Sequence, residues 1–312
     1  MIASLGQLVA DVVVKPVEKH PKAGTADRVD IIDLRTGGCG LNTATVLQKL
    51  GVEAAAMGKV GRDVFGEFLL KTIQERGLNA EGVVLDPNTR TSSVIVMISW
   101  SGERSFLYCP GGNEALTIDD VNFELIKRSQ ILHFGGIMKL ESLDLREFAR
   151  RVKESGATVS IDTDWDTRGW WLEWIEPCLA YADIFLPSVD EAKMLSKRNE
   201  VEEIADFFLN YGIKIVVIKM GRDGCSIRTP DVRLTVPAYE VKVADASGAG
   251  DAFVAGFLTG YYKGWDLERA GELANACGAL CVTEVGTSEG IRTLDETLAF
   301  MEVTPRVKSH GG

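Results

Sequence analysis

In the stretch Gly248-Ala249-Gly250-Asp251, a carboxylate follows directly after three residues that have little or no side chain. Small and aromatic residues then recur at helical spacing, so we expect a helix that begins near Ala249 or Gly250. The first N–H groups of a helix lack intrahelical partners and attract anions, and the helix dipole favours an ionised Asp251 in the first turn. A carboxylate base beside free N–H donors suits the transfer of a phosphoryl group to an alcohol.

The same stretch has a plainer explanation. Asp251 could simply stabilise the start of a helix after a tight turn, since short glycine motifs often occur without a function. The preceding segment, 234–243, is rich in β-branched residues and is predicted as a strand that runs into this turn. The rest of the chain must decide between the two interpretations.

The composition is that of an ordinary globular protein, with 312 residues of which 46% are hydrophobic and 25% charged. The chain has 34 Lys and Arg against 45 Asp and Glu, a formal charge of −11, which disfavours nucleic acid as a partner. The six cysteines have no metal-finger spacing and the three histidines lie far apart, so reduced thiols are expected rather than a zinc site. Because the N-terminus lacks a basic region and no apolar run reaches about 18 residues, we expect a cytoplasmic protein that does not enter a membrane.

Strands and helices alternate from Ile131 onward, and repeated β–α–β units imply a mostly parallel sheet with helices on both faces. The predicted strands are 131–134, 158–162, 184–187 and 214–219, and the predicted helices are 143–155, 169–179, 189–195 and 201–211. Ligands bind at the carboxyl ends of the strands in such sheets. This rule brings polar and glycine-rich groups to one edge of the sheet: Asp11, Gly37-Gly38, Asp162, Lys219-Met220-Gly221 and the 248–251 turn.

The N-terminal third predicts a strand over residues 1–14, interrupted at Gly6-Gln7, and polar hairpins within segments of about 12–35 and 90–112. These segments predict a small sheet of about four strands, too thin for a core of its own, that serves as a lid. A glycine-rich turn at 36–41 leads into a helix near Ala44, where Asn42 either caps the helix or binds a ligand. We expect one α/β domain over 1–304 with the lid inserted in it, and a flexible tail at 305–312.

Two spaced signatures are similar to those of the ribokinase-like (PfkB-type) carbohydrate kinases, and the resemblance runs along most of the chain. The N-terminal signature appears as Gly37-Gly38, Asn42, Leu50-Gly51 and Gly58-x-x-Gly61-Arg62-Asp63-x-x-Gly66, and the C-terminal one as Asp245-Ala-Ser-Gly248-Ala-Gly250-Asp251. Two signatures in this order are highly specific. The resemblance implies a ribokinase-like α/β fold and an ATP-dependent kinase that transfers the γ-phosphoryl group of Mg·ATP to a hydroxyl of a small carbohydrate.

The resemblance also implies roles for individual residues. Asp251 would be the catalytic base, and the backbone of Gly248, Ala249 and Gly250 would form the anion hole for the transferred group. Sugar contacts would come from Asp11, Gly37, Gly38 and Asn42, and nucleotide contacts from Lys219, Gly221, Gly224, Asn275 and Gly278. Glu191 would reach Mg²⁺ through water, and Asp245 with the loop 285–288 would either hold a monovalent cation such as K⁺ or form an ordinary capped turn. The lid hairpins would join two copies into a homodimer.

Three positions depart from the family pattern. Ala246 stands where Thr is usual, Ser188 replaces the Asn of Asn-x-x-Glu, and Asp164 stands in the segment usually written Asp-x-Asn-x-Arg, which here extends to Arg168. An outer-shell metal role therefore rests mainly on Glu191. Asp164 adds a negative charge near the phosphate path, to be paired by Arg168 or by a cation.

The acceptor stays open between a free sugar, which we favour, a nucleoside and a sugar phosphate. A nucleoside would need a stacking aromatic in the lid, for which Phe106 and Tyr108 are the candidates. A sugar phosphate would need a cation near the acceptor; Arg35, Arg90 and Arg104 are available, and Arg104 is included among the candidate substrate contacts. A catalytically silent regulator that binds sugar or nucleotide on the same fold also stays open.

Overall fold

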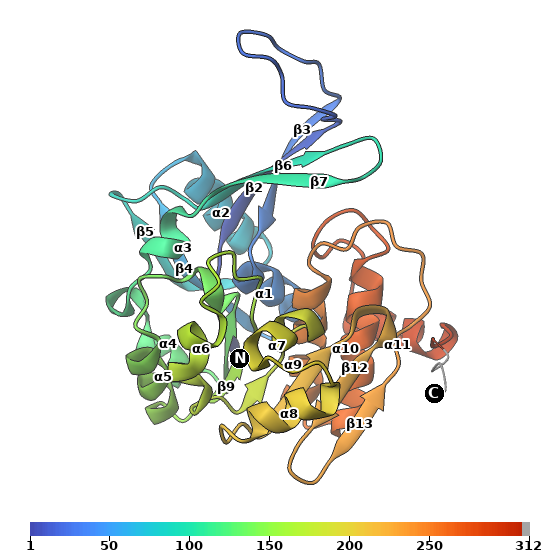
Figure 1. Ribbon diagram of the computed structural model, residues 1–312. Coiled ribbons are helices and arrows are strands. Elements are labelled where there is room, and N and C mark those ends of the chain that lie inside the picture. The colour runs from blue at the N-terminus through green and yellow to red at the C-terminus, as the bar shows by residue number, and fades with distance from the viewer. Residues whose placement is uncertain (308–312) are drawn as a thin grey trace.

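The computed structural model describes residues 1–307, which form a large central sheet and a small lid sheet. The central sheet has nine strands in the order β13-β12-β11-β10-β9-β8-β1-β4-β5, and the lid sheet has four in the order β3-β2-β6-β7. The pairs from β11 to β5 are parallel, whereas β12 and β13 add an antiparallel edge. Figure 1 shows the lid projecting from one end of the main body. The predicted α/β architecture with a small β lid is confirmed.

The strands have the following bounds. The central sheet contains β1 (Ile2–Gly6), β4 (Ala54–Gly61), β5 (Asn79–Asp86), β8 (Ile131–Gly135), β9 (Thr158–Ile161), β10 (Ile184–Phe185), β11 (Ile215–Lys219), β12 (Cys225–Arg228) and β13 (Arg233–Val236). The lid contains β2 (Val9–Lys15), β3 (Ile31–Gly37), β6 (Ser93–Ile98) and β7 (Arg104–Cys109).

The helices are α1 (Cys39–Lys49), α2 (Val64–Glu75), α3 (Gly111–Ala115), α4 (Phe123–Lys127), α5 (Leu145–Glu154), α6 (Trp171–Leu179), α7 (Val189–Ser196), α8 (Val201–Leu209), α9 (Ala249–Tyr262), α10 (Leu267–Cys281) and α11 (Leu294–Val303). Short 3-10 helices span Ile118–Asp120, Ile137–Lys139 and Gly221–Asp223. Within the part of the chain that the structure describes, no helix has both the length and the apolar character needed to cross a membrane.

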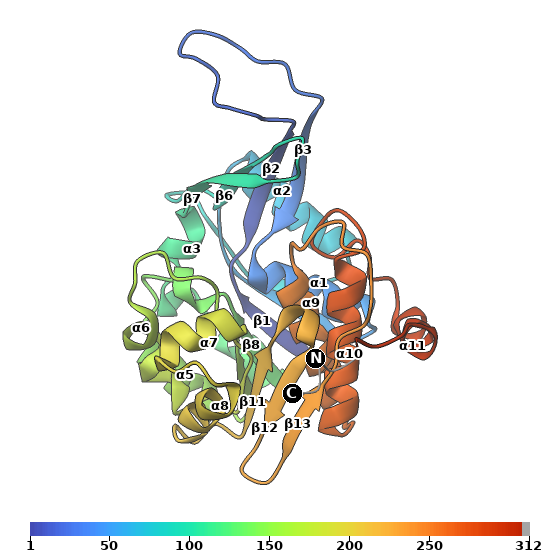
Figure 2. The same ribbon diagram turned by 45° about the vertical axis from the view of Figure 1, so that its right-hand side comes forward.

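Two hydrophobic clusters lie on opposite faces of the central sheet. One combines apolar side chains of α1, α2, α9 and α10, and the other those of α4 to α8. In Figure 2, α9 and α10 lie to one side of β11 to β13, and α5 to α8 lie to the other. Covering both faces explains why the central strands are almost wholly buried and hydrophobic.

The helix that carries Asp251, α9, lies deep in the first cluster and packs closely against α10. A Cβ atom at Gly256 would stand 2.8 Å from the Cα of Ala274, and one at Gly260 would stand 2.8 Å from the Cα of Ala270. These glycines therefore permit a close helix–helix contact that larger residues would prevent. The contact fixes the start of α9 relative to the sheet.

One strand prediction was incomplete and another was wrong: the interruption expected at Gly6-Gln7 is present, but the segments on its two sides belong to different sheets. Residues 1–14 form two strands rather than one, because the chain leaves the central sheet at Gly6-Gln7 and continues as β2 of the lid. The strand predicted over 234–243 ends at Val236, before Pro237, and residues 237–248 are irregular. Proline lacks the N–H that a continuing ladder would need.

The end of the described chain departs from the flexible tail expected at 305–312. Arg306 pairs with Tyr239 in an isolated β-bridge and its guanidinium contacts Glu272 at 2.6 Å, while the N–H of Val307 donates to the Ala238 carbonyl. Residues 305–307 are thus attached to the main body. Residues 308–312 lie outside the described part.

Candidate active site

Asp251 lies where the sequence placed it, in the first turn of α9, and is only 8% exposed. The preceding Gly248 has φ of 72°, and a Cβ there would stand 2.4 Å from the Thr287 carbonyl oxygen, so this turn requires glycine. Asn42 Nδ2 donates to Asp251 Oδ2 at 2.8 Å. The two sequence signatures therefore meet directly, through a hydrogen bond between α1 and α9.

The charge state of Asp251 differs from the simple expectation of a dipole-stabilised carboxylate. Burial raises its pKa, while the hydrogen bond from Asn42, the positive charge of Lys219 and the Cys39 thiol act in the opposite direction. The net shift is upward. A carboxylate whose pKa is moved toward neutrality is a better proton acceptor for an alcohol than an ordinary aspartate.

Lys219, at the end of β11, points inward. Its Nζ atom contacts both carboxylate oxygens of Asp162 at 2.7 Å, and it lies 3.6 Å from the position of a Cβ on Gly250. Burial disfavours its charge, but the surrounding carboxylates of Asp162, Glu191 and Asp251 outweigh burial and raise its pKa. Lys219 is thus a buried ammonium beside the N-terminus of α9.

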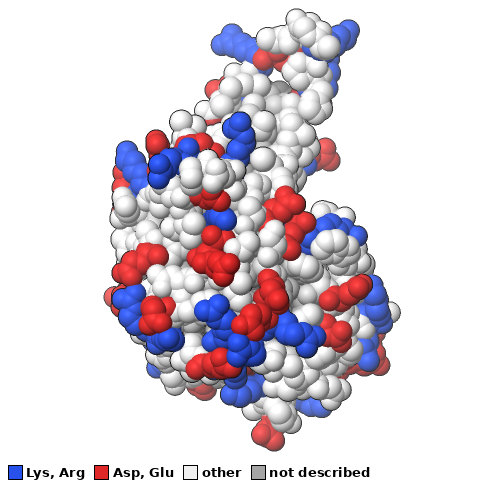
Figure 3. Space-filling model, turned by 90° about the vertical axis from the view of Figure 1, so that its left-hand side faces the viewer, with Lys and Arg blue, Asp and Glu red and all other residues white. Residues whose placement is uncertain are grey.

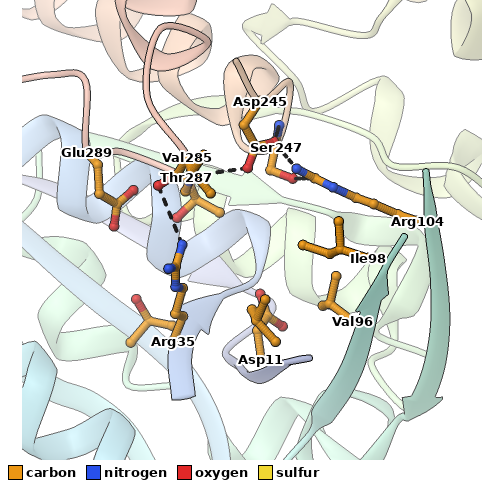
Figure 4. Close-up of a pocket in the computed structure, with 13 residues that line it drawn as sticks. Asp11, Arg35, Val96, Ile98, Arg104, Asp245, Ser247, Val285, Thr287 and Glu289 are labelled. Atoms are coloured by element: carbon orange, nitrogen blue, oxygen red, sulfur yellow. Dashed lines mark hydrogen bonds and ion pairs between the residues drawn. The ribbon is translucent and has the colours of Figure 1, made fainter. Parts of the chain in front are cut away.

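A pocket lies between the inner face of the lid and the loops around α9, as Figure 4 shows. Asp11, Val13, Arg35, Val96, Ile98 and Arg104 line it from the lid, and Asp245, Ser247, Val285 to Thr287 and Glu289 line it from the loops. Asp11 belongs to β2 of the lid and not to the end of a central strand, which corrects its predicted position. It still reaches the same edge of the molecule, and burial raises its pKa to about 6.

Gly37 and Gly38 occupy the junction between the lid and α1. A Cβ at Gly37 would stand 2.2 Å from Asp11 Oδ2, so the missing side chain leaves room for that carboxylate. Gly38 is the N-cap of α1, with no side chain to bond the helix N–H groups. Both glycines therefore border the space beneath the lid without filling it.

Arg104 does not extend freely into the pocket. Its guanidinium forms an ion pair with Asp245 Oδ1 and donates to the Ser247 hydroxyl, two interactions drawn in Figure 4. Arg35 pairs instead with Asp33 at 2.8 Å. Both arginine side chains that line the pocket are therefore already matched to carboxylates.

Glu191 and Ser188 form a capping box at the start of α7. Glu191 Oε2 accepts the Ser188 N–H at 2.9 Å and the Thr163 hydroxyl at 3.0 Å, and the Ser188 hydroxyl accepts the Glu191 N–H. Serine therefore keeps the N-cap function that asparagine would have. Within residues 1–307 no cluster of three or more His, Cys, Asp or Glu is arranged to hold a metal ion. Both hydrogen bonds that Glu191 accepts are on Oε2, so its Oε1 could accept a hydrogen bond from a water ligand of Mg²⁺.

The other residues predicted to contact the nucleotide lie near the backbone of Val236 and Pro237 and near the start of α9. Gly221 begins a 3-10 turn and Gly224 ends it, and a Cβ at Gly224 would stand 2.0 Å from the Val236 carbonyl oxygen. Asn275 Nδ2 donates to the carbonyls of Val236 and Pro237 at 2.9 and 3.2 Å, and Gly278 lies against the start of α9. Asn275 thus fixes the position of the Val236–Pro237 backbone through these two hydrogen bonds.

The structure adds two features that the sequence signatures did not reveal. The buried Asn42 Oδ1 has no hydrogen-bond partner among the described residues, although Nδ2 of the same amide donates to Asp251. Asp164 accepts hydrogen bonds from the Met138 N–H and Gln7 Nε2, and burial raises its pKa to about 7. Arg168, expected as its partner, pairs instead with Glu141 at 2.8 Å. In the sequence, the only signal for Asp164 was that an aspartate stands where the family pattern has an asparagine.

Of the two glycines in the predicted anion hole, Gly250 has the more open space beside its Cα atom. Ala249 directs its N–H toward the Ala246 carbonyl at 3.4 Å, whereas a Cβ at Gly250 would meet only the Lys219 ammonium, at an ordinary contact distance.

Gly250→Ala is therefore expected to fold normally and to lower kcat/KM for ATP by about 10-fold or more, because the new methyl group would cover the N–H donors. Steady-state kinetics and a melting curve would test this. Unchanged kinetics in a folded variant would remove Gly250 from the anion hole, and a large loss of Tm would show that the residue is needed for the fold itself.

Comparison with known proteins agrees with this geometry. The pfkB family carbohydrate kinase model matches residues 1–294. The probable fructokinase-5 of Arabidopsis thaliana is 33% identical over 284 residues, which cover 85% of this chain and 88% of that protein.

Two solved structures share the fold. A candidate ribokinase II from E. coli, in complex with ATP and Mg²⁺, has a TM-score of 0.86 at 24% identity and covers 96% of this chain and 98% of its own. A fructokinase from Vibrio cholerae O395, bound to fructose, ADP and calcium, has a TM-score of 0.80 at 23% identity with the same coverage.

Proposed function

This chain belongs to the pfkB family of carbohydrate kinases and is an ATP-dependent sugar kinase, and on that basis we propose that it phosphorylates an uncharged, fructose-like sugar. The observation that carries the proposal is the hydrogen bond from Asn42 to Asp251, with the unpaired Asn42 Oδ1 beside it. A sugar offers hydroxyl groups in close succession, and one hydroxyl can donate to Asn42 while its neighbour donates to Asp251.

In the proposed reaction, Asp251 takes the proton of the attacking hydroxyl as its oxygen bonds to the γ-phosphorus, and the bond from the γ-phosphorus to the β–γ bridging oxygen breaks so that ADP leaves. The N–H groups at the start of α9 and the Lys219 ammonium face the oxygens of the transferred group and stabilise their charge. Mg²⁺, when bound with ATP, would neutralise the phosphates, and Glu191 is the residue that would reach its water ligands. The lid excludes water, so that the phosphoryl group passes to the sugar and not to solvent.

The nucleotide is assigned to the region around the 3-10 turn at Gly221–Asp223. The support for this assignment is that Gly224 and Asn275 both contact the backbone of Val236, while Gly278 lies against the start of α9, so the residues implied for the nucleotide lie on adjoining elements. The E. coli protein bound to ATP and Mg²⁺ shares this fold, which supports the assignment.

An uncharged acceptor is favoured by the charges of the lid pocket. Arg104 is paired with Asp245, and Arg35 is bonded to Asp33 through Nε, so both guanidinium groups already have carboxylate partners that a substrate phosphate would have to compete with. The third candidate, Arg90, does not line the pocket. Asp11 and Glu289 add negative charge there, which suits hydroxyl donors and repels a carboxylate or phosphate.

The direct test is an acceptor panel in a coupled ADP-release assay, with fructose, ribose and other free sugars beside sugar phosphates, sugar acids and nucleosides. We expect the highest kcat/KM for a free sugar. Preference for a phosphorylated or acidic sugar would contradict the proposed acceptor. Preference for a nucleoside would favour stacking of its base on Phe106 or Tyr108 in β7, which are 59% and 42% exposed. Absence of turnover on every acceptor would favour a silent binding regulator.

The pKa of Asp11 leads to a prediction about pH. Sugar hydroxyls donate to the ionised carboxylate, and protonation below about pH 6 removes that acceptor. The Kd of the sugar, measured calorimetrically without ATP, should therefore rise as the pH falls from 7 to about 5. Asp11→Asn should bind the sugar weakly at all these pH values and lose most of the pH dependence. A wild-type slope in that variant would show that another group is responsible.

We also propose that two copies associate through the outer face of the lid. On this face Val12, Ile95 and Leu107 are cross-strand neighbours, and Ile32 lies beside them. Ile32, Ile95 and Leu107 are 71%, 40% and 50% exposed. An exposed apolar sheet face of this kind is typical of a protein–protein contact. The long loop of the lid, at the top of Figure 3, extends beyond the main body.

Ile32→Asp should shift the protein from dimer to monomer in sedimentation analysis, because a charge would lie in the apolar contact. Val64 at the start of α2, which is 73% exposed and lies outside the four lid strands, provides the matched control Val64→Asp. A wild type that sediments as a monomer would contradict the proposed interface.

The proposed partners are thus sugar, ATP and a second copy. On the face shown in Figure 3, basic and acidic side chains are intermixed and no continuous basic surface appears, which offers nothing to a nucleic acid backbone. The use of ATP fits the cytoplasmic location expected from the sequence.

A further inference from the structure

The turn that precedes α9 is organised around Asp245, the residue expected to hold a monovalent cation. Its carboxylate is 5% exposed and accepts the N–H of Ser247 at 2.8 Å on Oδ1 and the N–H of Gly286 at 3.1 Å on Oδ2. Asp245 therefore links the 245–248 turn to the 285–288 loop. Because Gly248 touches Thr287 in that loop, the link also fixes the start of α9.

A positive charge already balances this carboxylate. The Arg104 guanidinium, which comes from β7 of the lid, pairs with Asp245 Oδ1 and bonds the Ser247 hydroxyl. Burial alone would raise the pKa of Asp245, but its N–H partners and Arg104 hold the pKa below its usual range. The carboxylate is thus ionised, and each of its two oxygens already accepts a hydrogen bond from the protein.

Several carbonyl groups of the neighbouring loop also accept hydrogen bonds from protein donors. Lys49 Nζ, from the end of α1, donates to the carbonyls of Ser288 and Ile291 at 2.7 and 3.1 Å. The Cys281 Sγ atom lies 3.3 Å from the carbonyl oxygens of both Ser247 and Thr287, and its single S–H can donate to either one. Several of the oxygen atoms that a cation such as K⁺ would need are therefore already bound to protein donors, and the Arg104 guanidinium pairs with the one carboxylate among them. A donor set that already contains this positive charge does not fit a bound monovalent ion.

We infer that Arg104 is the fixed cation of the Asp245 turn, so that the protein works without a monovalent ion and completes its anion site only when the lid is closed. The inference rests on the proposed kinase function. Arg104 touches neither Asp251 nor the anion hole directly and is a positioning residue. Opening of the lid withdraws the guanidinium, which leaves Asp245 unbalanced and the 245–248 turn free to move.

The test compares the full-length wild type with Arg104→Ala, Arg104→Lys and Arg35→Ala. Sugar-dependent ADP release is measured in tetramethylammonium buffer alone, and after addition of K⁺, Na⁺ or guanidinium ion. Melting curves of the free proteins in the same buffers give a second readout that does not depend on turnover. Arg35→Ala removes an arginine from the same pocket wall but not from Asp245, and so controls for a general loss of positive charge.

The wild type should change by less than about 2-fold in kcat between these buffers. In Arg104→Ala, kcat should fall by about 100-fold, since misplacement of a site by about 1 Å can have that effect, and K⁺ or guanidinium should restore at least part of it. The same ions should raise the Tm of Arg104→Ala and not that of the wild type or of Arg35→Ala. Arg104→Lys, which keeps a positive charge, should retain more activity than Arg104→Ala and respond less to added ions.

A wild type that requires K⁺ would overturn the inference even if every variant failed to fold. It would also be overturned by a folded Arg104→Ala protein that keeps wild-type kcat, or one whose low kcat no cation restores. Failure of the kinase proposal is a different result, since the wild type would then release no ADP with any sugar in any buffer.

Discussion

Asp251→Asn is expected to lower kcat by about 10³-fold, within the range of about 10² to 10⁴ that general base catalysis contributes. The amide keeps the shape of the carboxylate but cannot take the proton of the attacking hydroxyl. The sugar KM should change much less, because Asp11 and Asn42 still face the substrate. Initial-rate kinetics with both substrates varied would separate the two effects.

The stability of this variant provides the control. Asp251 is buried, and burial raises its pKa, so removing the charge should leave the free energy of unfolding unchanged or slightly higher. A low kcat with normal stability would assign the loss to chemistry. An undiminished kcat would remove Asp251 from the base role and with it the mechanism proposed above.

Lys219→Met should have the largest effect on stability. It leaves Asp162, which is 2% exposed, without the ammonium that contacts both its oxygens. Breaking a buried ion pair in this way typically costs about 3–5 kcal/mol. Chemical denaturation monitored by fluorescence would measure the loss, and kcat should fall too because the ammonium faces the transferred group.

The loss should depend on pH in a defined direction. Burial is the largest influence on the pKa of Asp162 and raises it, and without Lys219 the strongest opposing charge is gone. The folded variant then binds a proton that the unfolded chain, with its lower pKa, releases. Stability is therefore highest at low pH and falls as the pH rises through the raised pKa of Asp162.

A matched double variant isolates the pair. Asp162→Asn in the Lys219→Met background removes the unpaired charge, and should recover much of the lost stability and abolish its pH dependence. Activity should stay low, since the ammonium is still missing. Equal stability of the single and double variants would show that the ion pair contributes little, and that Lys219 acts only on the substrate.

The start of α9 was predictable because the signal is local. Glycines followed by an aspartate and a helical repeat determine both the turn and the position of Asp251. The strand expected before it failed because β-branched composition was given more weight than Pro237, which stops the ladder after Val236. Local chemistry at one proline outweighed the propensity of the surrounding residues.

The pairing of Arg104 with Asp245 could not be predicted in the same way. Asp245 begins the C-terminal signature, whereas Arg104 lies outside both signatures, in β7 of the lid. Nothing in their local sequence indicates that a lid arginine reaches across to the turn before α9. The same holds for Lys49, whose ammonium bonds a loop far along the chain. Long-range partners of this kind depend on how the lid and main body pack together.

Asp11 shows an intermediate case. Its approach to the active-site edge was predicted correctly, but from the wrong element, because Gly6-Gln7 divides one apolar run between the central sheet and the lid. The distinction matters for mechanism. As part of the lid, Asp11 moves with it, so that sugar binding and lid closure are expected to be coupled.

The most direct test of Asp251 as the catalytic base is transfer of label from [γ-³²P]ATP to a free sugar, followed in a single turnover with wild type and Asp251→Asn side by side. We expect the wild type to move the label to fructose or a similar uncharged sugar in an amount equal to the ADP formed, and the variant to do so about 10³-fold more slowly. Label that appears only as inorganic phosphate, or equal transfer rates in the two proteins, would contradict this prediction.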